Sequence, residues 1–329
     1  SGSEDSTIEL WDLQAADLSA RPITISSNGT EIRVMAFSRD GRWLAAGGDN
    51  NDAFLWNLAD LGAAPVTLSG HAANIKSLAF SPDGRWLATG SVDETIRLWD
   101  LQAPDPAQDS RVLVRHNGDI SALAFSPDGL WLASGSLDTT ARLWRVTDSG
   151  AQSIALEGHL RNVSALAFSP DGHWLATGSY DHTARLWDMK ALDPAANPVV
   201  LLGHEGIVTA LAFSPDSRWL ATASDDHTAR LWDVTAPNPA ANPLILRGHG
   251  DAINTLDFSP SGRWLATGSS DHAVRLWDVQ APDPAANPGI LRGHDDAVFT
   301  LAFSPDGLWL ATGGGDSSTR FWNMDTAFP

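Results

Sequence analysis

Residues 70–100 read GHAANIKSLAFSPDGRWLATGSVDETIRLWD, and this stretch contains the pattern that decides the fold. An apolar run from Ile75 to Phe80 is followed by Ser81-Pro82-Asp83-Gly84, which has proline and glycine where a tight turn needs them. Strand composition resumes from Trp86 to Ser91, and a second turn leads into Thr95–Trp99. The stretch therefore predicts three antiparallel strands joined by two tight turns.

The pattern recurs along the chain and is marked by tryptophans. One set follows Leu or Phe at intervals of 43 or 45 residues: Trp11, Trp56, Trp99, Trp144, Trp187, Trp232, Trp277 and Trp322. A second set opens "WLA" segments: Trp43, Trp86, Trp131, Trp174, Trp219, Trp264 and Trp309. A short apolar run such as Val112–Val114 completes each unit with a fourth strand. One four-stranded sheet cannot cover both its faces, so we expect an all-β fold in which seven such units stack around an axis.

Two residue pairs recur in step with these strands. A Gly-His pair occurs at Gly70-His71, Gly158-His159, Gly203-His204, Gly248-His249 and Gly293-His294, and a Trp-Asp pair occurs at Trp99-Asp100, Trp187-Asp188, Trp232-Asp233 and Trp277-Asp278. This pattern resembles the WD40 repeat family, especially bacterial-type members with near-identical repeats. The resemblance implies a seven-bladed β-propeller with four-stranded antiparallel blades. Four departures change one member of a pair each: Trp56-Asn57, Arg115-His116, Trp144-Arg145 and Trp322-Asn323.

The ends of the chain contain one strand more than seven blades need. The resemblance implies a ring closed by an N-terminal outermost strand, and Pro22–Ile25 is predicted to complete the blade of Phe303 and Trp322 in this way. Thr7–Leu13 and Ser318–Met324 then compete for the third position in that blade. We expect Ser318–Met324 to hold it, because closing a loop costs more for the distant segment. Thr7–Leu13 is then predicted to be mobile or to bind elsewhere.

The predicted organisation follows from the repeat array. Residues 1–20 are expected to be a cloning remnant plus the surplus strand, and residues 21–325 a single seven-bladed domain. Because Ser1-Gly2-Ser3 lacks methionine and the chain enters the array within a unit, we interpret it as a fragment of a longer protein.

Composition excludes several classes of function. The formal net charge of −19 repels nucleic acid and anionic lipid, and it attracts basic partners. The chain has no cysteine, which rules out disulfides and thiolate chemistry, and neither a signal peptide nor a membrane-spanning run is present. We therefore expect a cytoplasmic protein that binds no nucleic acid, no membrane and no cofactor.

Every unit after the first contains a His, a Ser or Thr, an Asp and a Trp at fixed offsets. These sets are His71, Thr89, Asp93, Trp99; His116, Ser134, Asp138, Trp144; His159, Thr177, Asp181, Trp187; His204, Thr222, Asp226, Trp232; His249, Thr267, Asp271, Trp277; and His294, Thr312, Asp316, Trp322. A catalytic triad is needed only once, so six copies argue against a hydrolase. The resemblance implies a structural relay of hydrogen bonds from Asp to the indole N–H, which we call the relay. The first unit has Asn28, Ala46, Asn50 and Trp56 there, and its blade is predicted to be the softest.

Other chemistry-like residues have structural interpretations. His182, His227 and His272 follow relay aspartates in three successive units, where they lie too far apart to share a metal ion. We therefore predict no metal site. The arginines two residues before the second member of each tryptophan pair are expected to lie across indole faces or to pair with acids: Arg97, Arg142, Arg185, Arg230, Arg275 and Arg320.

Positions that differ between near-identical units are those that the shared geometry does not dictate. They cluster in two loops that the WD40 resemblance places at a rim, a frequent docking face for peptides. We predict an apolar sector of Val92, Leu137, Leu160 and Tyr180 and an acidic sector of Glu205, Asp225, Asp251, Asp295 and Asp296. Such a surface suits a protein or peptide segment with an apolar anchor beside Lys or Arg.

Two functions follow from this reasoning. The first is a non-enzymatic scaffold that presents its rim loops to a protein or peptide. The second is a sensory or autoinhibitory propeller within a larger bacterial signalling protein, whose effector domain would lie outside this sequence. The sequence leaves the partner and the oligomeric state open.

Overall fold

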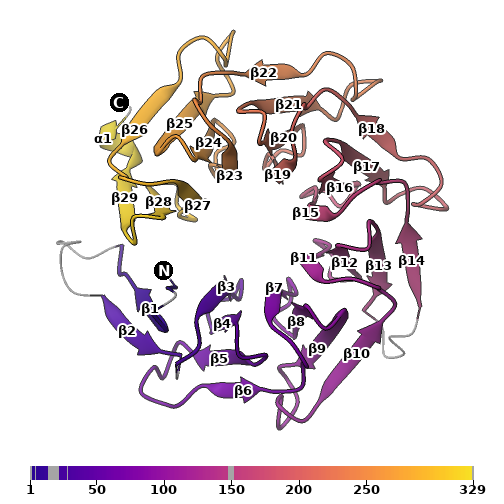
Figure 1. Ribbon diagram of the computed structural model, residues 1–329, viewed down its shortest axis with the longest axis vertical. Coiled ribbons are helices and arrows are strands. Elements are labelled where there is room, and N and C mark those ends of the chain that lie inside the picture. The colour runs from indigo at the N-terminus through magenta and orange to yellow at the C-terminus, as the bar shows by residue number, and fades with distance from the viewer. Residues whose placement is uncertain (1, 4, 14–21, 28, 147–151, 328–329) are drawn as a thin grey trace. The chain divides into compact units, whose positions relative to one another are not determined.

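The computed structural model describes residues 2–3, 5–13, 22–27, 29–146 and 152–327. Its described elements are twenty-nine strands, β1 to β29, and one short helix, α1 (Met324–Ala327). The strands form seven consecutive blades in which neighbouring strands are antiparallel and follow chain order, as Figure 1 shows for each blade. The predicted all-β fold with seven blades is therefore confirmed.

The blades have the following strands. Blade 1 is β3 (Ile32–Phe37), β4 (Trp43–Gly48), β5 (Ala53–Asn57) and β6 (Val66–Leu68); blade 2 is β7 (Ile75–Phe80), β8 (Trp86–Ser91), β9 (Thr95–Asp100) and β10 (Ser110–Val114); blade 3 is β11 (Ile120–Phe125), β12 (Trp131–Ser136), β13 (Ala141–Arg145) and β14 (Ser153–Leu156). Blade 4 is β15 (Val163–Phe168), β16 (Trp174–Ser179), β17 (Ala184–Asp188) and β18 (Val199–Leu201); blade 5 is β19 (Val208–Phe213), β20 (Trp219–Ser224), β21 (Ala229–Asp233) and β22 (Leu244–Leu246). Blade 6 is β23 (Ile253–Phe258), β24 (Trp264–Ser269), β25 (Ala273–Asp278) and β26 (Gly289–Arg292); blade 7 is β27 (Val298–Phe303), β28 (Trp309–Gly314) and β29 (Thr319–Asn323).

The first turn of each blade is fixed by its own side chains. In blade 2 the Ser81 hydroxyl accepts the Trp86 backbone N–H at 2.8 Å, and Asp83 accepts the Arg85 N–H at 3.0 Å. Gly84 has a φ of +69°, a conformation that costs glycine little. The Ser-Pro-Asp-Gly sequence thus sets the register in which β7 pairs with β8.

The apolar core lies between successive blades. Leu55 and Leu68 of blade 1 pack with Ile75, Leu87 and Trp99 of blade 2, and all five are almost completely buried. Burying a side chain of this size contributes about 1.5–3 kcal/mol, so each blade depends on its neighbour for its stability.

The chain divides into two compact units, Ser1–Gly158 with β1 to β14 and His159–Pro329 with β15 to α1. Within the first unit the innermost strands β3, β7 and β11 contact one another in succession, and within the second β15, β19, β23 and β27 do the same. Each unit is thus a stack of whole blades.

The ends of the chain correct one expectation and confirm another. β29 pairs with β28, so the segment 318–324 does hold the third position of blade 7. Ring closure by Pro22–Ile25 is wrong, because β2 (Ile23–Ser26) pairs with β1 (Thr7–Leu10) and the described part of blade 7 has three strands.

The surplus strand binds elsewhere, as one of the two predicted alternatives stated. Ile8 of β1 is fully buried with Ile25, Ile32 and Phe54, beside blade 1. The physical reason for the correction is loop closure: β1 and β2 are close in sequence, whereas β29 is nearly 300 residues away.

Candidate functional site

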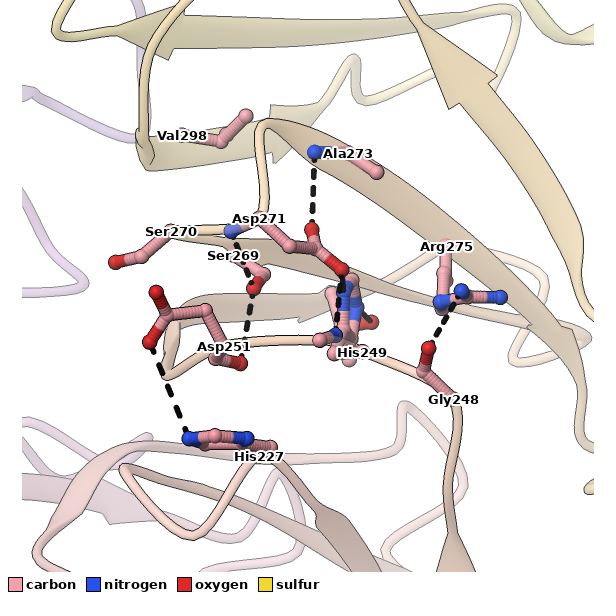
Figure 2. Close-up of polar contacts among 12 residues, drawn as sticks. His227, Gly248, His249, Asp251, Ser269, Ser270, Asp271, Ala273, Arg275 and Val298 are labelled. Atoms are coloured by element: carbon pink, nitrogen blue, oxygen red, sulfur yellow. Dashed lines mark hydrogen bonds and ion pairs between the residues drawn. The ribbon is translucent and has the colours of Figure 1, made fainter.

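The relay residues come together in the second tight turn of each blade and the loop that precedes its first strand. In blade 6, His249 Nδ1 lies 2.9 Å from Asp271 Oδ2 and Nε2 lies 2.8 Å from Thr267 Oγ1. Trp277 Nε1 donates to the same hydroxyl at 3.0 Å. Figure 2 shows the turn around Asp271, which also accepts the Ala273 backbone N–H at 3.0 Å. The relay therefore joins a loop, a turn and two strands of one blade.

Counting donors fixes the direction of each hydrogen bond. The Trp277 indole N–H can only donate, so Thr267 Oγ1 accepts it. The Thr267 hydroxyl hydrogen is then available for His249 Nε2, and the Nδ1–H donates to the Asp271 carboxylate. Every polar atom in the chain of contacts is satisfied with a neutral imidazole.

The same geometry occurs in all six sets predicted from the sequence. The distance from His Nδ1 to the carboxylate is 2.7–3.0 Å, and that from His Nε2 to the hydroxyl oxygen is 2.8 Å. The indole nitrogen lies 2.8–3.0 Å from that oxygen. The six histidine side chains are at most 2% exposed.

The carboxylates of the relay are held ionised. Burial alone would raise the pKa of Asp93, but hydrogen bonds from Thr95, the Ala72 backbone N–H and His71 outweigh it and lower the pKa to about 2. The same balance lowers the pKa of Asp181 to about 2. It also lowers the pKa of Asp138, Asp226, Asp271 and Asp316.

The imidazoles are held neutral. Burial lowers the pKa of His71, His159 and His249 and outweighs the neighbouring aspartate, which acts in the opposite direction. A neutral histidine beside an ionised aspartate and a hydroxyl has the composition of a triad. However, Thr267 and its equivalents are at most 1% exposed, so no substrate can reach the hydroxyl. The arrangement can fix a fold but cannot attack an ester or a peptide.

Blade 1 lacks this arrangement, as its sequence indicated. Among the described residues, the buried Trp56 Nε1 has no hydrogen-bond partner, because Ala46 stands where the other blades have a hydroxyl. Asn50 keeps one part of the aspartate's role, since its Oδ1 accepts the Asp52 N–H at 3.2 Å. Asn28 lies outside the described residues.

The arginines before the relay tryptophans have a partner that sequence reasoning missed. In blade 6, Arg275 Nη2 donates to the Gly248 carbonyl at 2.6 Å (Figure 2). Arg97 and Arg230 donate to the equivalent carbonyls of Gly70 and Gly203 at 2.7 Å. Arg97 also lies 5.9 Å from the centre of the Trp99 ring. These guanidinium groups therefore tie the loop before each relay histidine to the third strand.

The three turn histidines adopt left-handed backbone conformations. His182, His227 and His272 have φ between 65° and 69°. His227 lies 3.9 Å from Asp251 of the next blade, as Figure 2 shows. In the described part of the chain, no group of three or more His, Asp or Glu side chains is arranged to hold a metal ion.

The structure places the nine predicted rim residues in the loop before the first strand or in the second turn of their blades. Leu160 is 82% exposed, Tyr180 and Leu137 are each 40% exposed, and Val92 is half-buried. The five acidic residues are all exposed: Glu205, Asp225, Asp251, Asp295 and Asp296. Val92 and Leu137 belong to residues 1–158, and the other seven belong to residues 159–329.

One exposed apolar residue in these loops was not predicted. Phe299 is 60% exposed at the second position of β27 and, with Asp296, lies next to Gly315. The signal was present in the sequence, because this position reads Arg33, Lys76, Ser121, Ser164, Thr209, Asn254 and Phe299 in successive units. Such variation marks it as a rim position by the rule used for the others.

Comparisons with known families agree with this architecture. The family model described as the IFT122 first beta-propeller matches residues 31–234, which is more than half of the chain. The model described as WD domain, G-beta repeat, matches residues 242–278 and 287–323. The chain therefore belongs to the family that the first model describes, within the WD40 β-propellers. No curated protein matches it significantly.

The class sets what can be said of function in general. The fold is that of a seven-bladed WD40 β-propeller, and propellers of this family generally serve as non-enzymatic scaffolds that bind proteins or peptides. No helix among the described residues has the length and apolar character to cross a bilayer.

Proposed function

We propose that this chain is a non-enzymatic scaffold that binds a protein segment carrying an apolar anchor beside basic residues. The docking surface, which we call the rim surface, consists of Leu160, Tyr180, Glu205, Asp225, Asp251, Asp295 and Asp296. All seven residues lie in the unit of residues 159–329. The observation that carries the proposal is the presence of exposed apolar side chains on blade 4 and exposed acids on blades 5 to 7 at equivalent positions.

Antiparallel pairing brings these positions to one end of each blade. The loop before the first strand and the turn between the second and third strands lie at the same end, and backbone hydrogen bonds join them. In blade 4 the Tyr180 N–H donates to the Asn162 carbonyl at 3.0 Å, and the Leu160 N–H donates to Asp181 at 2.8 Å. The backbone under both apolar side chains is therefore fixed by the relay, which reduces the entropy lost on binding.

The acidic part of the rim surface has little internal compensation. Among the described residues, its only ion pair is that of Asp251 with His227, and it forms only when the histidine is protonated. Clustered uncompensated charges of one sign attract the opposite sign and accelerate association. Basic residues flanking the anchor would thus find complementary charge on blades 5 to 7.

Peptide selection tests the proposal directly. A library of random twelve-residue peptides is selected on the purified chain, and a recovered peptide is measured with variants. We expect the recovered peptides to combine Lys or Arg with an aromatic or aliphatic residue. The double change Leu160→Ser with Tyr180→Ser should weaken binding by about tenfold or more, because a buried anchor loses its contacts.

Matched controls separate the rim surface from the rest of the molecule. Leu192 is fully exposed in the loop at the other end of blade 4, so Leu192→Ser should leave affinity unchanged. Asp295→Asn with Asp296→Asn should weaken binding and reduce its salt dependence, whereas Asp283→Asn in the loop before β26 should not. Equal losses in Leu192→Ser and in the rim double variant would refute the rim surface as the docking site.

A further inference from the structure

A cavity of about 490 Å³ lies against the outer strands of blade 3. Its lining residues are Arg115, Trp131, Arg142, Arg145, Gln152, Ser153 and Ile154. Three of these are arginines and none is acidic, in a chain whose formal net charge is −19. Its volume lies within the range of about 300–1,000 Å³ that is typical of small-molecule sites. The cavity is far from the rim surface in composition and independent of the function proposed above.

Two of the arginines are departures from the repeat. Arg115 stands where five units have the glycine that precedes the relay histidine, and Arg145 stands where four units have the aspartate that follows the relay tryptophan. Both departures fall in the same unit, and both side chains line the same cavity. The fold requires neither of them, because the other blades are built without them.

The change at position 115 alters the contacts of the third arginine. In blade 2 a Cβ atom on Gly70 would lie 2.5 Å from the Arg97 guanidinium carbon, so glycine is what lets Arg97 reach the Gly70 carbonyl. Arg115 has a Cβ atom. In blade 3 Arg142 makes one hydrogen bond among the described residues, a long contact of 3.3 Å to Ser153 Oγ, and its buried Nε has no partner. The guanidinium of Arg142 is thus released from its role in the loop.

The change at position 145 reverses a charge. In blades 2, 5 and 6 an arginine before the "WLA" tryptophan pairs with the aspartate of the Trp-Asp pair, at 2.8–3.1 Å. Blade 3 has Leu130 and Arg145 at these two places, so the base now stands where the acid was. Arg145 lies 5.9 Å from the centre of the Trp131 ring. Within the described residues, Arg115, Arg142 and Arg145 form no ion pair.

We propose that this cavity binds a small organic phosphate monoester. Three guanidinium groups without a protein counter-charge suit a dianion, and arginine binds phosphate oxygens in a bidentate geometry. Trp131 and Ile154 offer apolar contact to the organic group, and Gln152 and Ser153 offer neutral hydrogen bonds. Arg115 and Arg145 are exposed, so the ligand can enter from solvent.

Calorimetric titration with phenyl phosphate and with inorganic phosphate tests the site. Arg115→Gly and Arg145→Asp restore the residues of the other blades, so each change has a precedent in a folded blade. We expect each to weaken phenyl phosphate binding by about tenfold or more, as loss of a charge-assisted contact predicts. Arg218→Leu in blade 5 is the matched control, because it removes one arginine at a position where blades 3 and 7 have leucine. It should change the affinity less than about twofold.

The comparison of the two ligands tests the organic part of the proposal. Phenyl phosphate should bind more tightly than inorganic phosphate, since only the former reaches Trp131 and Ile154. Thermal unfolding of each variant verifies that the blade still folds. Absence of phenyl phosphate binding, equal affinity for the two ligands, or an equal loss in Arg218→Leu would overturn the proposal.

Discussion

Blades 1 and 6 are built from the same strands and differ in what lies behind the buried tryptophan. In blade 6 the Trp277 indole ends a chain of four hydrogen-bonded side chains, whereas in blade 1 the Trp56 indole N–H has no partner in the described structure. Both tryptophans are buried, Trp277 completely and Trp56 to 98%. The apolar packing of a blade therefore does not need the relay.

The difference shows what the relay adds. An unpaired buried N–H costs roughly 1–3 kcal/mol, and the loop before the first strand loses its tie to the second turn. Asn50 of blade 1 still closes the turn through Asp52, so only the long-range half of the network is missing there. We infer that the relay joins loop to turn, and that the rim surface depends on it for a fixed backbone.

The largest effect is expected from removing a relay carboxylate. Asp226 accepts hydrogen bonds from His204, from the Glu205 N–H and from both the N–H and the hydroxyl of Thr228. Asp226→Ala leaves these donors without a partner and should lower the free energy of unfolding by about 1–3 kcal/mol, measured by urea denaturation. Peptide binding at the rim surface should survive in the folded fraction.

The neighbouring residue provides the control for this change. Asp225 is exposed and its carboxylate has no ion pair among the described residues, so Asp225→Ala should change stability by less than about 0.5 kcal/mol. Similar losses for both variants would mean that the relay carboxylate has no special role.

Acid should remove the same contribution without mutation. The pKa of Asp93 and of Asp181 is lowered to about 2 in the folded protein. A group with a lowered folded pKa stabilises above its unfolded pKa and loses that contribution as the pH falls through the folded value. We therefore expect the free energy of unfolding to fall between about pH 4 and pH 2.

A variant isolates this titration. Asp93→Asn cannot ionise, so its stability should differ most from that of the parent above about pH 4 and converge with it towards about pH 2. The lowered pKa of His71, His159 and His249 acts in the same direction at higher pH, because protonation opposes their burial. Parallel stability profiles of parent and variant would contradict this account of Asp93.

Restoring one acceptor in blade 1 should give a smaller, opposite effect. Ala46 is fully buried at the position of the relay hydroxyl, so Ala46→Thr places an oxygen near Trp56 Nε1. Ala46→Val has nearly the same shape without the oxygen. We expect the Thr variant to be more stable than the Val variant by about 1 kcal/mol, the usual net contribution of one hydrogen bond. Thermal unfolding of the pair measures it, and equal stability would show that the indole N–H needs no partner.

Most of the fold could be predicted because the pattern is copied seven times. The turns, the strand order and all six relay sets follow from offsets that repeat without a slip, so each unit supports the interpretation of the others. The partner of Ile23–Ser26 could not be predicted in the same way. Two segments with the same strand composition, Thr7–Leu10 and Thr319–Asn323, can pair with it, and chain proximity rather than composition decides.

Features that occur once were the harder part. The cavity in blade 3 depends on Arg115 and Arg145 acting together, and each looked like an isolated departure in the sequence. The Arg275 contact to the Gly248 carbonyl depends on a backbone shape that residue type alone does not reveal. Comparing units position by position finds the substitutions, but only coordinates show which of them meet.

The smallest expected effect concerns a residue that distinguishes blade 6 from blade 1 outside the relay. Asp257 of β23 stands where the other six units have alanine, Ala36 in blade 1, and its Oδ2 accepts the Phe303 N–H of blade 7 at 3.0 Å. Burial raises the pKa of Asp257, so the ionised form is disfavoured and its contribution to stability falls as the pH rises. Asp257→Ala should therefore gain stability relative to the parent between pH 4 and pH 7, by less than about 1 kcal/mol. Asp257→Asn keeps an acceptor for Phe303 without the charge and separates the two terms. If the difference between the parent and Asp257→Ala does not change with pH, the carboxylate is not destabilised by burial, and the comparison of blades 1 and 6 needs no correction for it.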